Sequence, residues 1–266
     1  MTATITAPTA PGREVTPSAA ADEIWDLIEH GLAHQPRSLQ KRIGPSELGA
    51  DCIHCLAAKL AGWEKTQDRA WLPAIGTGMH LLLEELFTSF EAENTSGAPR
   101  FLMEQRVTVG DIGGTPITGS TDLVDLYAGM TVDWKLVGPS SLRKYKTGPS
   151  ATYRAQAHLY AKGWRAAGHD ISTVAICFLP RNSPNMRDGF WWHEPYDEQL
   201  ALDVLARAND LHATLTALAA VGTETRDAWI SQLPRASDCW DCARFPDYER
   251  KTPTKTSSLL DGLATA

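Results

Sequence analysis

Two Cys-x-x-Cys pairs, far apart in the chain, constrain this sequence more than any other feature. Cys52 and Cys55 form the first pair, and Cys239 and Cys242 form the second. Two residues between thiolates let both sulfurs reach one metal site, and two such pairs supply the four ligands that zinc or an iron–sulfur cluster requires. Cys55 and Cys239 are 184 positions apart, so a shared metal would tie the start of the fold to its end. The alternative is two unrelated pairs of reduced cysteines.

Length and composition indicate a globular protein. The 266 residues are 43% hydrophobic and 21% charged, which suits one large domain or two small ones. No apolar run reaches the roughly 18 residues of a membrane span. The segment before Asp22 lacks the basic start and apolar stretch of a signal peptide. We therefore expect a cytoplasmic protein with no membrane partner, in which paired cysteines bind metal more often than they form disulfides.

The formal net charge of −7 argues against a protein that coats nucleic acid through bulk positive charge. It is compatible with an enzyme whose carboxylates hold metal ions and whose positive surface is local. The best candidate for such a surface is the run of Arg143, Lys144 and Lys146, with Tyr145 between them. This run could follow a phosphate backbone. The alternative is a solvated loop.

Hydrophobic periodicity predicts helices at both ends of the chain and strands between them. Tails rich in small and polar residues are expected over 1–20 and 251–266, with a single domain over 21–250. We predict helices over 21–34, from 46 or 51 to 62, 76–91, 153–167, 197–221 and 225–232. Strands are predicted over 101–109, 115–120, 121–127, 130–135, 172–179 and 189–193. This order predicts an α/β core with helical additions.

Asp133 and Lys135 lie two residues apart near the end of a predicted strand. Side chains at positions i and i+2 share one face of a strand, so the carboxylate and the ammonium point into the same space. A lysine there could orient a water molecule or stabilise charge on a phosphate. For the tripeptide taken alone, we favour a solvated ion pair.

Asp122 and His80 could complete a metal site around this tripeptide. Asp122 lies on the preceding predicted strand, which the Ala128-Gly129 turn would pair with the strand of Asp133. Two neighbouring carboxylates are expected ligands for Mg²⁺ or Mn²⁺. His80 would reach the site from the margin of the apolar stripe of its helix. Glu104, on an earlier strand, could also face the site, but we favour a solvent-facing charge.

Four short motifs follow one another in a specific order: His80 on a helix, Gly119-Ser-Thr-Asp122, Asp133-Trp-Lys135, and Gln156-Ala-His-Leu-Tyr160 on a helix. In this order the chain resembles the RecB-type nucleases of the PD-(D/E)XK superfamily, from about residue 46 to residue 248. The resemblance implies a restriction-endonuclease-like core, in which helices flank a central mixed sheet.

By that resemblance, His80, Asp122, Asp133 and the main-chain carbonyl of Trp134 would ligate Mg²⁺ or Mn²⁺, and Lys135 would be the catalytic lysine. Gln156 and Tyr160 match the family's Gln-x-x-x-Tyr motif, whose members lie near the active site and the DNA. Positions i and i+4 share one helix face, which Tyr153 extends, so an aromatic ring there could stack on an unpaired base. The alternative for both tyrosines is ordinary packing against the sheet.

The resemblance also covers the cysteines. An iron–sulfur subset of the family, which includes the CRISPR-associated exonucleases and the AddB-type helicase–nucleases, brackets its core with cysteines. Members of that subset usually contribute one cysteine from the N-terminal side and three from the C-terminal side, whereas this chain offers two and two. A four-iron four-sulfur cluster is our first expectation and a four-cysteine zinc site the alternative, with a structural role in either case.

The function that these patterns predict is metal-dependent hydrolysis of DNA. The resemblance favours an exonuclease acting on single-stranded DNA or DNA ends, in recombination, repair or CRISPR adaptation, with the proteins of those pathways as possible partners. The competing hypothesis is a non-catalytic DNA-binding or complex-assembly protein that keeps the nuclease fold and the metal clamp. Fold-level analogy alone does not separate the two.

Overall fold

The computed structural model describes residues 17–33, 43–66, 71–237 and 239–247. The chain divides into two compact units, one made of residues 1–40 and 67–75 and the other of residues 41–66 and 76–266. In the first unit, helix α1 (Pro17–Ala33) begins before the predicted position 21. The expected tail over 251–266 and most of the tail over 1–20 lie outside the described residues.

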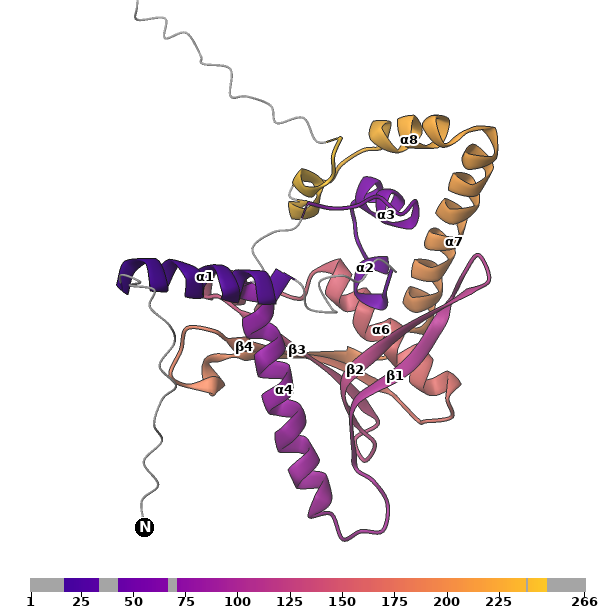
Figure 1. Ribbon diagram of the computed structural model, residues 1–266. Helices are drawn as coiled ribbons and strands as arrows, with labels where there is room; N and C mark the ends of the chain where they lie inside the picture. The colour runs from indigo at the N-terminus through magenta and orange to yellow at the C-terminus, as the bar shows by residue number, and fades with distance from the viewer. Residues whose placement is uncertain (1–16, 34–42, 67–70, 238, 248–266) are drawn as a thin grey trace, which may run out of the picture. The chain divides into compact units, whose positions relative to one another are not determined.

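The second unit is built on a five-stranded mixed sheet (Figure 1). The strands run in the order β1 (Phe101–Ile112), β2 (Thr115–Asp125), β3 (Met130–Val137), β4 (Thr173–Pro180) and β5 (Phe190–Pro195). Neighbouring strands are antiparallel except β3 and β4, which are parallel. The expected mixed sheet flanked by helices is therefore confirmed, although β2 is a single strand where the sequence predicted two.

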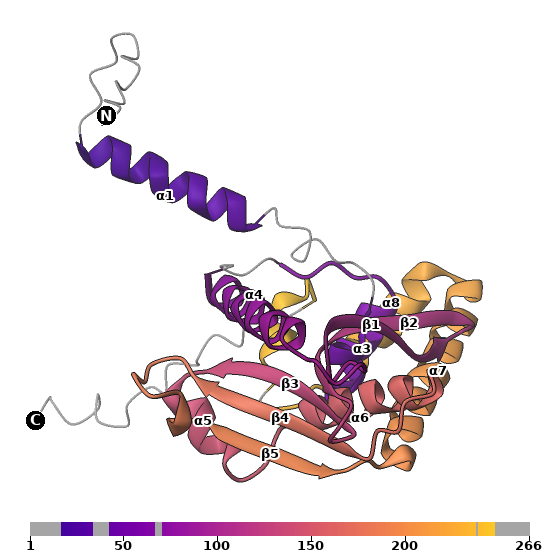
Figure 2. The same cartoon turned by 90° about the horizontal axis from the view of Figure 1, so that it is seen from below.

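Helices cover both faces of this sheet, and the alternation along β4 separates the two faces. Val174, Ile176 and Phe178 belong to the core that includes α2 (Pro45–Leu48), α6 (Ala151–Ala166) and α7 (Glu198–Val221). Ala175, Cys177 and Leu179 belong to the opposite core, against α4 (Trp71–Ala92). Successive strand residues point to opposite faces, so the cores lie on opposite sides of the sheet. Figure 2 shows α4 and the sheet from below.

Helix α4 buries only part of the apolar stripe that predicts it. Met79, Leu83 and Phe87 pack against the sheet. Leu82 and Phe90, which the same periodicity assigns to the stripe, are exposed. His80 lies at the margin of the packed face, next to Met79, and the packed residues Met79, Leu83 and Phe87 hold its helix against the sheet.

The chain between β3 and β4 contains a short helix that the sequence did not predict. Helix α5 (Pro139–Tyr145) begins at a proline in its first turn, which follows the extended residue Gly138. Pro fits the first helical position because the missing N–H has no intrahelical partner there. The expected basic run therefore lies on and just after this helix rather than in a loop.

A third hydrophobic core joins the N-terminal and C-terminal parts of this unit. It is formed by α3 (Ile53–Leu60), α7, α8 (Thr223–Gln232) and the 3₁₀ turn η2 (Trp240–Arg244), and it contains Leu56, Leu211, Leu215, Ile230 and Phe245. Another 3₁₀ turn, η1 (Met186–Asp188), precedes β5. Helix α3 begins directly after Cys52, and η2 begins directly after Cys239. The two cysteine pairs thus lie at matching helix starts in one core.

None of the helices in the described part of the chain is long and apolar enough to span a membrane.

Candidate active site

The candidate site lies where β2 and β3 stop pairing. The two strands pair over Leu123–Asp125 of β2 and Met130–Val132 of β3. Just beyond this stretch, side chains take the place of a strand partner at Trp134. The N–H of Trp134 donates to Asp122 Oδ2 at 2.7 Å, and its carbonyl accepts from His80 Nε2 at 3.1 Å. We call this point the β2–β3 fork.

Three ligand-type side chains gather at the fork. His80 Nδ1 lies 3.4 Å from Asp122 Oδ1 and 3.7 Å from Glu104 Oε1. One ligand atom from each of the three residues lies within 4.8 Å of the other two. Burial opposes a charge on the imidazole, but the hydrogen bonds to Asp122 and Glu104 outweigh burial and raise the pKa of His80 to about 9. The two carboxylates therefore make this position strongly attractive to a cation.

Glu104 corrects the sequence analysis, which expected it to face solvent. Continuing the β1–β2 register from Met103–Leu123 to Gln105–Thr121 places Glu104 opposite Asp122. Its backbone has φ +48°, unlike the other non-glycine residues of the described chain. A non-glycine residue in this region is strained by about 1–3 kcal/mol, and such strain is often found at functional sites. At Glu104 the strained backbone accompanies a carboxylate aimed at His80.

Asp133 and Lys135 form a partly buried ion pair beside this group. Lys135 Nζ lies 2.5 Å from Asp133 Oδ2, and Gln156 Nε2 donates to Asp133 Oδ1 at 2.9 Å. Asp133 is 4% exposed, and burial raises the pKa of its carboxyl to about 6, although the Lys135 ammonium acts in the opposite direction. Asp133 is not part of the tight group of His80, Glu104 and Asp122.

Gln156 and Tyr160 come together with the site but are buried. Each is 6% exposed, and Tyr160 belongs to the core between α6 and the sheet. Burial raises the pKa of the Tyr160 hydroxyl, which stays protonated. A ring so covered has no free face for a DNA base, so packing accounts for Tyr160, while Gln156 positions Asp133.

A line of aromatic rings leads from Lys135 to the basic run. Lys135 Nζ lies 4.9 Å from the centre of the Tyr153 ring, which is 5.6 Å from the Tyr145 ring on α5. Tyr145 in turn stacks on Phe178 of β4 at 4.5 Å. The Tyr145 ring points inward, whereas the basic residues of the run are exposed, namely Arg143, Lys144 and Lys146.

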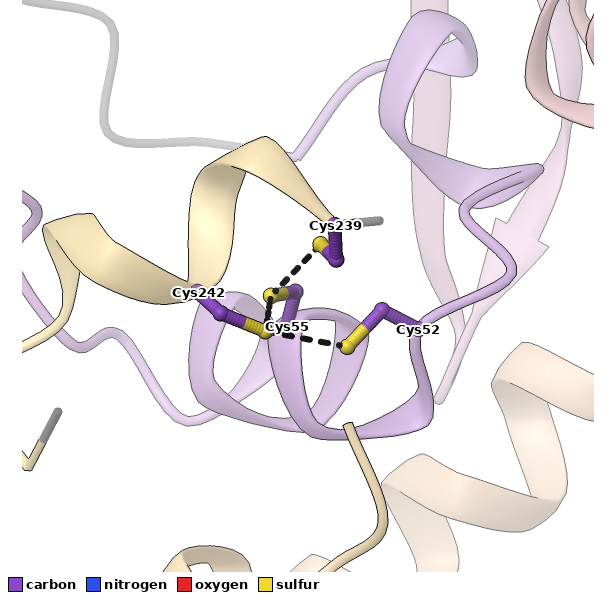
Figure 3. A group of neighbouring side chains, drawn as sticks. All are labelled: Cys52, Cys55, Cys239 and Cys242. Carbon is purple, nitrogen blue, oxygen red and sulfur yellow. Dashed lines mark hydrogen bonds between the residues drawn. The ribbon is translucent and has the colours of Figure 1, made fainter. Parts of the chain in front are cut away.

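The four paired cysteines form a second group, at the start of α3 and of η2 (Figure 3). Cys242 Sγ lies 3.4 Å from the sulfurs of both Cys52 and Cys55, and Cys239 Sγ lies 3.5 Å from that of Cys55. All four sulfurs lie within 4.8 Å of one another, and three of the four residues are buried. These four thiols could bind a metal that links the N-terminal and C-terminal parts of the unit.

Polar residues surround the cysteines on one side. His54 is fully buried, and its Nδ1 lies 3.9 Å from Cys55 Sγ. Its Nε2 lies 3.0 Å from Arg235 and from Asp247, which form an ion pair with each other. A proton on Nδ1 would be donated to the sulfur, and a proton on Nε2 would be donated to the Asp247 carboxylate, which can only accept. The hydrogen bond to the sulfur favours the thiolate form that metal binding requires.

Comparisons with known proteins reveal likenesses in fold. No family model and no curated protein matches the chain. Among solved structures, the chain is similar to an alkaline exonuclease (LHK-Exo) from Laribacter hongkongensis, with 13% identity, a TM-score of 0.46, and coverage of 71% of this chain and 94% of that chain. It is also similar to a phage-related exonuclease from Haemophilus somnus, with 14% identity, a TM-score of 0.44, and coverage of 72% and 96%. At these TM-scores, an activity must be argued from the side chains of the site.

Proposed function

We propose that this chain is a divalent-metal-dependent deoxyribonuclease. One observation carries the proposal: a tight group of His80, Glu104 and Asp122 lies at the β2–β3 fork, next to the Asp133–Lys135 pair. An ordinary surface ion pair would not gather an imidazole and two carboxylates around one point. A site that concentrates negative charge beside a single lysine suits a cation and a phosphate together.

The donor set fits Mg²⁺ or Mn²⁺. Both ions prefer carboxylate oxygens and accept carbonyl oxygen or imidazole, which Asp122, Glu104, Trp134 and His80 offer at the fork. Asp133 is available as a further ligand from the adjacent strand. When bound, the cation would supply positive charge to the phosphodiester and lower the pKa of a water molecule.

The chain's own residues would orient the reacting groups. Lys135 would present its ammonium to a phosphoryl oxygen or hold the attacking water, and the Tyr153 ring keeps this side chain in place through a cation–π contact. Gln156 would fix the carboxylate of Asp133 by donating to one oxygen, which leaves the other oxygen for Lys135. Tyr153 and Gln156 would therefore preorganise Lys135 and Asp133 for the reaction.

We further propose that the substrate is single-stranded DNA or DNA with a free end. The exposed run Arg143, Lys144 and Lys146 follows the strand of Lys135 and would bind a phosphate backbone leading into the site. A local track of this kind suits a protein with a net charge of −7. The family resemblance favours exonuclease action in recombination, repair or CRISPR adaptation.

The test is cleavage of end-labelled single-stranded, linear double-stranded and covalently closed circular DNA by the purified protein, with Mg²⁺, with Mn²⁺ and with a chelator. We expect metal-dependent cleavage of the linear substrates and none with the chelator. DNA binding without cleavage under every metal condition would instead support the non-catalytic hypothesis. Cleavage of the closed circle would assign an endonuclease.

A further inference from the structure

We propose that the four cysteines hold one zinc ion, and that the iron–sulfur cluster expected from the family resemblance does not fit this chain. The inference concerns the cysteine group alone. It is independent of the proposed nuclease activity, because the cysteines lie in the core of α3, α7, α8 and η2 and not at the β2–β3 fork.

The sulfur positions suit a single shared ion. A Zn–S bond is about 2.3 Å long, so two sulfurs on one zinc are at most about 4.6 Å apart, and about 3.8 Å apart at tetrahedral angles. The close pairs here are 3.4–3.5 Å apart, and all four sulfurs lie within 4.8 Å of one another. Small side-chain rotations would bring every sulfur to the tetrahedral separation.

A four-iron cluster demands a different arrangement. Each cysteine then binds a separate iron, so the cluster itself separates the sulfurs, by roughly 6 Å. A two-iron cluster would likewise hold two of its cysteines away from the other two. No pair among these four cysteines is that far apart. Making room would move α3 and η2 away from each other and open the core that Leu56 and Phe245 fill.

The surroundings also favour a closed structural zinc site. Structural zinc sites are almost always tetrahedral, and four cysteine thiolates are one of their usual ligand sets, which leaves no open position. Cys52, Cys55 and Cys242 are buried, and the side chain of His54 closes the group on one side. Such sites often take two ligands from each of two chain segments. Here two cysteines lie at the start of α3 and two at the start of η2.

The decisive measurement is the metal and sulfide content of the full chain, purified without oxygen from cells supplied with both iron and zinc. We expect one zinc per chain, no acid-labile sulfide and no absorption in the visible region. Four iron and four sulfide per chain, with broad brown absorption, would overturn the proposal. A single iron without sulfide would overturn the choice of zinc.

Two variants locate the metal within the chain. Cys242→Ser should lose the zinc, whereas Cys177→Ala should keep it, because Cys177 lies on β4 in the core between the sheet and α4, away from the four cysteines. Zinc retained in Cys242→Ser at wild-type stoichiometry and affinity would contradict the assignment.

If Cys242→Ser does not fold, cobalt exchange in the wild-type chain tests the same point. One Co²⁺ per chain, with the intense visible bands of tetrahedral tetrathiolate coordination, is expected. Weak bands of six-coordinate cobalt would overturn the proposal. None of these readouts depends on DNA cleavage, so a failed nuclease assay and a failed zinc assignment are distinguishable.

Discussion

At the scale of single residues, the backbone of Trp134 organises the site. Beyond the paired stretch of β2 and β3, its N–H and carbonyl would be left without strand partners, and buried groups of this kind need partners. Asp122 accepts from the N–H and His80 donates to the carbonyl. The hydrogen-bonding demand of the backbone N–H and carbonyl of one buried residue, Trp134, therefore brings a carboxylate and an imidazole to the same point.

Glu104 is the residue on which we predict the first mutational effect. Glu104→Gln keeps the shape but removes the charge, so the cation site should weaken, and the Mg²⁺ concentration for half-maximal cleavage should rise about tenfold or more. The measurement is the Mg²⁺ dependence of DNA cleavage. Glu85→Gln, which changes an exposed carboxylate on α4, is the matched control and should behave like the wild type. Equal Mg²⁺ dependence in both variants would exclude Glu104 from the site.

Most residues of the candidate site were predictable from the sequence, but Glu104 was not. Motif order and strand alternation were enough to group His80, Asp122, Asp133 and Lys135. They could not reveal Glu104, because a single glutamate in a strand gives no motif, and its position depends on the β1–β2 register and on a positive φ. Counting the register from the Gly113-Gly114 turn would place Glu104 opposite Leu123, because the irregularity between Thr108 and Gly110 that shifts the pairing by one residue leaves no signal in the sequence.

At the scale of elements, long periodic segments were predictable and short ones were not. Helices α4, α6 and α7 and strands β1, β3, β4 and β5 fall within a few residues of their predicted ranges, whereas β2 joins two predicted strands into one. Helix α5 was missed because seven residues rich in Pro and Ser carry no full apolar period. The burial of Gln156 and Tyr160 also lies beyond sequence patterns, since it depends on how closely α6 approaches the sheet.

The close approach of α6 to β1 gives the second prediction. A Cβ at Gly163 would lie 2.8 Å from the carbonyl oxygen of Thr108 and 2.9 Å from a methyl group of Val107. Gly163→Ala should therefore lower the free energy of unfolding by about 1–3 kcal/mol through overpacking. Urea denaturation measures this change.

Gly78→Ala is the matched control, because a Cβ there meets nothing within 4 Å in a helix. This variant should be as stable as the wild type or more stable by about 0.5–1 kcal/mol. Equal stability changes in the two variants would show that α6 does not pack as closely as described.

At the scale of the whole molecule, the cysteine group closes the structural unit. It joins α3, near the start of the unit, to η2, near its end, so a metal bound there would close a chain loop that contains the sheet. Closing a long loop limits the unfolded ensemble, and metal binding adds to folding free energy. The net charge is acidic, so the positive charge that a DNA substrate requires would come from bound ions, Lys135 and the run on α5.

Metal removal should therefore destabilise the fold in a metal-specific way. Stripping the protein with a strong chelator should lower the unfolding free energy by about 3 kcal/mol or more, by analogy with the loss of a crosslink that closes a long loop. Thermal unfolding after dialysis measures the effect. Zn²⁺ should restore stability, while Mg²⁺ at the same concentration should not. Recovery with Mg²⁺ alone would place the stabilising ion at the β2–β3 fork instead.

The most direct test of the central claim is the cleavage rate of Lys135→Met on end-labelled DNA under saturating Mg²⁺. Removing the ammonium while keeping the stem should reduce the rate by about 100-fold or more, while the folded protein still binds DNA through the run on α5. Lys162→Met, on α6 outside the site, should cut like the wild type. Cleavage by Lys135→Met at the wild-type rate would contradict the account.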